Sequence, residues 1–153
     1  MYRKLNRTET ELNSLCATLT NTNFLLPHSK ARRDLDELVE ACNLQRPIGI
    51  VLSDELSKRH WTVTKLLAKA DIPSSTYYDK YATRLDFKDE RYFKLLQSES
   101  SLYYLIRALG LYGKDKDILL DAYDPRRLVD AFADKYHLSN DDVLHILTYL
   151  GWK

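Results

Sequence analysis

The residues best suited to chemistry in this 153-residue chain lie in one short segment rich in lysine, serine and tyrosine. Hydroxyl groups can donate or accept hydrogen bonds at base edges, a carboxylate can accept from a cytosine amino group, and an aromatic ring can pack on a thymine methyl group. Lysine and arginine contact the phosphates. We therefore expect base-edge contacts from Ser74, Ser75, Thr76, Tyr78 and Asp79, and phosphate contacts from Lys65, Lys69, Lys80 and Arg84.

Two short helices joined by a tight turn would position these side chains. Thr62 and Ser74 are typical helix N-caps, and they predict one helix over 63–70 and a second from Ser74 through Tyr81. Asp71 tolerates the left-handed conformation that ends the first helix. Ile72 then fills the angle between the helices, and Leu66, Leu67, Ala70 and Tyr77 face the interior. This order is typical of a helix-turn-helix.

The stretch from Trp61 to Tyr81 resembles the helix-turn-helix of bacterial insertion-sequence transposases and phage-type regulators, which often ends in a similar serine, threonine and tyrosine run. The resemblance implies a DNA-binding unit and not a transposase, because nothing looks like the three-carboxylate catalytic core of those enzymes. Two positions depart from the pattern: Leu67 stands where a small residue is usual, and Lys80 where an apolar one is common. Either the helices open more widely, or Tyr81 takes over that packing.

The local charge agrees with a phosphate-binding surface. Residues 58–84 hold six basic and two acidic side chains, a net charge of +4, whereas residues 95–153 have a net charge of −2. A basic segment can meet phosphate while the rest of the chain stays near neutral. The alternative is a chance fluctuation on a solvated face.

A second corner, around residues 133–146, fits the same spacing, with Ser139 as the cap of its second helix. Its expected exposed face carries Asn140, Asp141 and Asp142, whose carboxylates would repel phosphate. We expect this corner to serve packing or protein contacts. Helix-turn-helix geometry is also a common corner of helical bundles, so the segment over 62–81 has the same structural alternative, with Tyr77 and Tyr81 as core residues.

The whole chain predicts an all-α fold, a compact bundle of short helices containing a tri-helical helix-turn-helix. Apolar residues recur at helical spacing throughout, and no alternating run is long enough for a strand. A first helix is expected to start at a capping box of Thr8 and Glu11. We divide the chain into an N-terminal helical pair (1–45), the helix-turn-helix unit (46–86) and a C-terminal helical bundle (87–153), within one continuous structural domain.

Other kinds of function find little support in the sequence. The motifs GxxxxGK[ST], GxGxxG and HExxH are absent, so we expect no enzyme activity, no catalytic residue, no cofactor and no metal site. Cys16 and Cys42 fall on apolar helix faces and predict buried free thiols. Without a signal peptide or a long apolar run, we expect a cytoplasmic protein that does not contact membranes.

Eleven tyrosines raise the question of a protein interface. In the adjacent pairs Tyr77/Tyr78 and Tyr103/Tyr104 at most one ring can face the core, and the outward rings, with Tyr112, Tyr123 and Trp152, are interface candidates. The alternative is rings lying on the surface with a wet hydroxyl. We expect double-stranded DNA as the partner, with a homodimer to strengthen binding. The rival hypothesis is a small helical adaptor or inhibitor that binds a protein through its C-terminal half.

Overall fold

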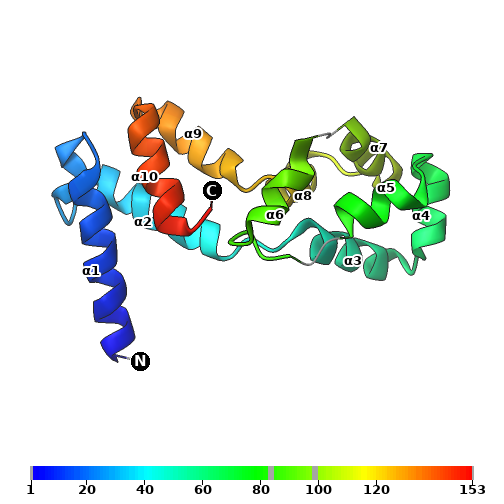
Figure 1. Ribbon diagram of the computed structural model, residues 1–153, viewed down its shortest axis with the longest axis horizontal. Coiled ribbons are helices and arrows are strands. Elements are labelled where there is room, and N and C mark those ends of the chain that lie inside the picture. Colours follow the sequence, from blue (N-terminus) through cyan, green and yellow to red (C-terminus); the bar gives the residue numbers. More distant parts are fainter. Residues whose placement is uncertain (1, 83–84, 98–99, 153) are drawn as a thin grey trace. The chain divides into compact units, whose positions relative to one another are not determined.

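The computed structural model describes residues 2–82, 85–97 and 100–152, and every regular element among them is a helix (Figure 1). The all-α class is therefore confirmed. No described helix combines the length and the apolar character that a membrane span requires. The chain divides into two compact units: unit 1 comprises Met1–Leu44 and Arg126–Lys153, and unit 2 comprises Gln45–Pro125.

These units group the chain differently from the division expected above. The border near residue 45 recurs, but residues 87–125 lie in one unit with residues 46–86, and the last 28 residues lie with the N-terminal helices. The cause is packing between segments far apart in sequence, which the apolar periodicity of each helix does not encode.

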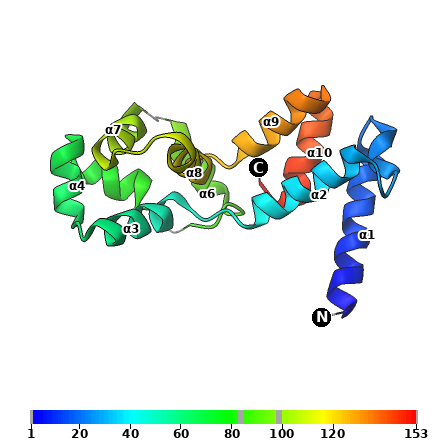
Figure 2. The same cartoon turned by 180° about the vertical axis from the view of Figure 1, so that it is seen from behind.

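Unit 1 contains four α-helices and one short 3-10 helix. In chain order these are α1 (Tyr2–Thr18), η1 (Thr22–Leu25), α2 (Lys30–Asn43), α9 (Arg126–Tyr136) and α10 (Asn140–Leu150). The expected start of the first helix at Thr8 is wrong, because α1 begins at Tyr2. Figures 1 and 2 show α2 beside α9 and α10, and the contacts of these helices agree.

An aromatic cluster and a buried carboxylate hold the helices of unit 1 together. Phe24 lies 5.8 Å from Phe132 and 5.4 Å from Tyr136 between ring centroids, which joins η1 to α9. Ser139 caps α10 as expected, in a capping box with Asp142. Asp142 itself was expected on the exposed face, and this is wrong: its carboxylate is buried and accepts hydrogen bonds from Thr20.

Unit 2 contains the remaining elements, which are α3 (Ile48–Arg59), α4 (Val63–Ala70), α5 (Ser74–Thr76), the π-helix η2 (Tyr77–Tyr81), α6 (Glu90–Lys94), η3 (Leu95–Gln97), α7 (Ser100–Leu109) and α8 (Gly113–Tyr123). Helix α4 packs on α7, α3 packs on α8, and η2 contacts α3 and η3. Fully buried leucines at Leu52, Leu66, Leu105 and Leu119 form the centre of this packing.

Tyrosines also belong to the core of unit 2. The Tyr92 hydroxyl donates to the carbonyl oxygens of Ala122 and Tyr123 at the end of α8, and burial raises the pKa of Tyr92 well above its usual range. Tyr81 and Tyr123 lie 5.6 Å apart between ring centroids. Tyr123 and, in unit 1, Trp152 are both buried, so the expectation that they form an outward interface is wrong.

Candidate nucleic-acid interface

The first helix of the segment over 62–81 has the caps that its sequence predicts. The Thr62 hydroxyl accepts from the Lys65 amide at 3.2 Å, and α4 covers Val63–Ala70. Asp71 is left-handed, with φ at 56° and ψ at 49°. Because the chain reverses there, the amide of Ile72 donates to the Leu67 carbonyl at 3.3 Å, and the Ile72 side chain is buried. The turn is thus defined by backbone conformation and by one apolar contact.

The second helix differs from the prediction in its first residue and in its winding. Pro73 stands at the N-cap position, with no side-chain cap hydrogen bond, so the expected cap at Ser74 is wrong and Ser74 is the first helical residue. After Thr76 the helix widens into η2, where the Ala82 amide donates to the Tyr77 carbonyl at 2.9 Å. π-helical turns are rare in proteins, and those that do occur often lie at functional sites.

The tyrosines of this helix lie in two different settings. Tyr77 and Tyr81 are both buried, whereas Tyr78 is 59% exposed and its ring meets Tyr77 edge to face at 5.3 Å between centroids. Burial, and then the neighbouring Tyr78, raise the pKa of Tyr77. Tyr81 is fully buried, and its ring lies 5.6 Å from that of Tyr123 between centroids, whereas Lys80 and Leu67 are half-buried.

The residues expected to contact base edges lie along the first turns of the second helix, between and before the buried tyrosines. Four of the five are exposed and Thr76 is half-buried; the exposed ones are Ser74, Ser75, Tyr78 and Asp79. The exposed residues therefore offer two serine hydroxyls, one phenol and one carboxylate to a ligand. Asp79 is the only acidic residue among the four, and none of them is basic.

The four residues expected to contact phosphate lie in three different settings. Lys65 and Lys69 are exposed on α4, and neither forms an ion pair with any residue that the structure describes. Lys80, on η2, is half-buried. Arg84 lies outside the described residues. The exposed positive charge of the segment is thus concentrated on α4.

Trp61, which is not among the residues expected to contact DNA, lies at the centre of this positive charge. Its half-buried indole ring has the Lys65 ammonium at 5.0 Å and the Lys69 ammonium at 5.2 Å from its centroid. The Arg59 guanidinium is 5.7 Å away. Lys65 and Lys69 are four residues apart on α4 and lean toward its N-terminus, so a tryptophan directly before the N-cap Thr62 would have indicated the cluster.

An open groove of about 320 Å³ borders the second helix on one side of Tyr78. Its wall combines apolar side chains of α3 and α4 with the aromatic rings of η2, and the lining residues are Gly49, Ser53, Leu56, Val63, Tyr77, Tyr78 and Ala82. An apolar surface next to an exposed tyrosine suits a methyl group or a ring edge better than an ionic group.

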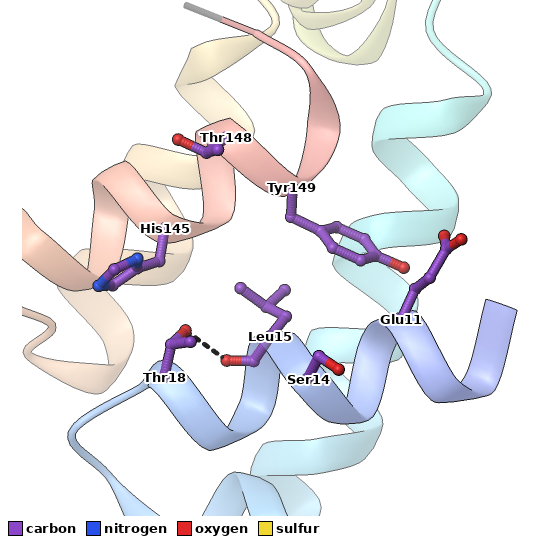
Figure 3. A pocket seen from close by; sticks show the side chains of 7 residues that line it. All are labelled: Glu11, Ser14, Leu15, Thr18, His145, Thr148 and Tyr149. Atoms are coloured by element: carbon purple, nitrogen blue, oxygen red, sulfur yellow. Dashed lines mark hydrogen bonds between the residues drawn. The ribbon is translucent and has the colours of Figure 1, made fainter. Parts of the chain in front are cut away.

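Unit 1 has its own open pocket, of about 430 Å³, between α1 and α10 (Figure 3). Tyr149 extends over α1 toward Glu11, and burial, followed by the charge of Glu11, raises the pKa of Tyr149. The hydroxyls of Ser14 and Thr18 donate to carbonyl oxygens of α1 itself, at 3.1 Å and 2.6 Å. The hydrogen bonds of these hydroxyls are therefore made within α1, and neither hydroxyl is paired with a general base in the pocket.

The turn between α9 and α10 has the same left-handed residue and the same kind of amide–carbonyl hydrogen bond as the turn at Asp71, but it exposes an acidic residue. His137 is left-handed, with φ at 52°, and the Leu138 amide donates to the Ala133 carbonyl at 3.0 Å. Asp141 is exposed, and Asp142 connects α10 to the end of α1. Among the residues that the structure describes, no group of three or more His, Cys, Asp and Glu side chains is placed to hold a metal ion.

Comparison of the chain with models of known protein families, with curated proteins and with solved structures found no significant match.

Proposed function

We propose that this protein binds double-stranded DNA in a sequence-dependent way through a helix-turn-helix formed by α4, α5 and η2, with α3 as the supporting third helix. In such a unit the second helix enters the major groove and its N-terminal residues face base edges. The proposed role is that of a transcriptional regulator or accessory factor of a phage or other mobile element, as the resemblance over residues 61–81 implies.

One observation carries the proposal. The second helix buries Tyr77 and Tyr81 and exposes Ser74, Ser75 and Tyr78, while α4 just before it carries Lys65 and Lys69 without a carboxylate partner among the described residues. Hydrogen-bonding groups for base edges and cations for phosphates thus lie on adjacent helices. DNA-binding proteins use these two kinds of contact for different purposes: base contacts read the sequence, and phosphate contacts position the protein.

The base-contacting face supports modest specificity. Bidentate contacts from arginine, asparagine or glutamine discriminate best between bases, and this face has none of the three. Two copies on one duplex would add their contacts, with half-sites about 34 to 36 Å apart or at multiples of that distance. We therefore propose a homodimer, which sedimentation equilibrium of the full chain with and without duplex would test.

The central experiment measures binding of a fluorescent random-sequence duplex by anisotropy over a range of salt concentrations. We expect the affinity to fall linearly with salt on a log–log plot, and the double variant K65M/K69M to lower the slope by about two, because each lysine releases about one counterion. The matched control is K88M/K114M, which removes two other exposed lysines of unit 2. No binding to any duplex at low salt, or an equal loss in both double variants, would overturn the proposal.

The second candidate function is a protein-interaction module, which exposed aromatic residues favour. Tyr103 and Tyr104 on α7 are 55% and 51% exposed, and Tyr112, at the start of α8, is 82% exposed. Tyrosine is enriched at protein interfaces. If K65M/K69M leaves the chain's biological effect intact while Y103S/Y104S abolishes it, the second function replaces the first.

A further inference from the structure

The backbone of Trp61 is held between two helix ends. His60 is left-handed, with φ at 55°, and the Trp61 amide donates to the Leu56 carbonyl at 3.0 Å, which closes the end of α3. The next residue, Thr62, caps α4 through the Lys65 amide. Because the backbone on both sides of Trp61 is held in this way, the direction in which the Cα–Cβ bond of Trp61 leaves the chain is fixed by the two helix ends.

Two lysines of α4 converge on this ring from positions one and two turns along the helix. Their ammonium groups lie 5.0 Å and 5.2 Å from the ring centroid, for Lys65 and Lys69 respectively. Side chains of a helix lean toward its N-terminus, which is the end where Trp61 lies. The distances are within the range of about 6 Å in which a cation is attracted to an aromatic face.

The third cation at the ring has a different role. Arg59 forms an ion pair with Glu55 at 2.6 Å, and its other nitrogen donates to the Leu109 carbonyl at 2.8 Å. Its charge is therefore compensated, and it ties the end of α3 to the end of α7. In contrast, Lys65 and Lys69 bring two positive charges to one ring with no carboxylate partner in the described part of the chain.

We infer that Trp61, Lys65 and Lys69 form a binding site for backbone phosphates of DNA, in which Trp61 is the positioning residue of the two lysines. The inference rests on the proposed function and extends it. Like charges four residues apart on a helix repel each other, and the negative face of the indole ring offsets that repulsion. Lysine side chains that are ordered in advance lose less conformational freedom when their ammonium groups donate to phosphate oxygens.

A double-mutant cycle tests the role of Trp61. We expect W61L to weaken binding of the random-sequence duplex about three- to tenfold in the wild-type chain and to have no further effect in K65M/K69M. W61F keeps an aromatic face and should retain most of the affinity. K114M is the control for loss of one exposed lysine of the same unit outside the cluster.

The outcomes separate the inference from the proposed function. Absence of duplex binding by the wild-type chain overturns both. Wild-type binding that W61L leaves unchanged, or a W61L loss that persists in K65M/K69M, overturns the inference alone, because Trp61 then does not act through the lysines.

A second measurement on the unaltered chain covers the case in which W61L does not fold. Of the two tryptophans, Trp152 is buried and Trp61 is half-buried, so acrylamide quenches mainly Trp61 fluorescence. We expect duplex DNA to protect Trp61 from acrylamide and high salt to remove the protection. Unchanged quenching upon DNA binding overturns the inference.

Discussion

Replacing Asp142 with alanine is expected to destabilise unit 1 strongly. The sequence alone does not predict this effect, because it places Asp142 on the exposed face of a helix in its first turn. Its carboxylate accepts from the Thr20 amide and hydroxyl, both at 3.1 Å, and from the Ser139 amide at 3.4 Å. D142A therefore removes half of a capping box and leaves three donors without their acceptor. A lost cap costs about 1 kcal/mol and unpaired half-buried donors add a similar amount or more, so the total is about 2 to 3 kcal/mol.

Thermal unfolding of the full chain measures this loss. For a unit of 60–100 residues, 1 kcal/mol shifts the midpoint by about 4 to 8 °C, so D142A should lower it by about 10 to 20 °C. In a W61F background, fluorescence comes from Trp152 alone, which reports unit 1 because it is buried there. D141A is the matched control: it removes an exposed carboxylate at the same helix end and hence the same favourable interaction with the helix dipole.

The effect of D142A has a defined pH dependence. Burial raises the pKa of Asp142, but hydrogen bonds from Thr20 and Ser139 together hold it below its ordinary value. A lowered pKa in the folded state means that the stabilisation is present above the unfolded value of about 3.9 and is lost as the pH falls through the folded value. The difference in thermal unfolding midpoint between the wild type and D142A should therefore become smaller below about pH 4. Equal midpoints for D142A and D141A at pH 7 would refute this account of the carboxylate.

Three further results are expected. L66A should lower the free energy of unfolding in urea by about 2 to 5 kcal/mol, since Leu66 is fully buried in α4. L67A should lower it clearly less, because Leu67 is half-buried, and equal losses would contradict the packing of α4. Y136F and K135M should each raise the pKa of Asp34 in an NMR titration, because the hydrogen bond from Tyr136 and then that from Lys135 are the largest causes of its lowered pKa; an unchanged pKa in Y136F would contradict this. Cys16 and Cys42 should react with a thiol reagent only after unfolding by urea, since both are buried and burial raises the pKa of Cys16; fast labelling of the native chain would contradict this.

The sequence by itself determined the helices and most of their ends. The caps at Thr62 and Ser139, the left-handed Asp71 and the buried Ile72 all follow from interactions within a few residues of the chain. Such interactions depend on residue type and spacing alone. The same is true of the exposed face of the second helix, because burial of Tyr77 and Tyr81 leaves Ser75 and Tyr78 on the outside.

Only the tertiary structure decided which helices pack together and what the distant partners of a side chain are. The burial of Asp142 required Thr20, and the grouping of α9 and α10 with α1 and α2 required apolar faces that many other helices could have covered. The convergence of Lys65 and Lys69 on Trp61 depended on the left-handed His60, which sets the path of the backbone between α3 and α4. Local propensity fixes where a helix begins and ends, but long-range contacts choose among many apolar surfaces of equal character, and one sequence does not distinguish those surfaces.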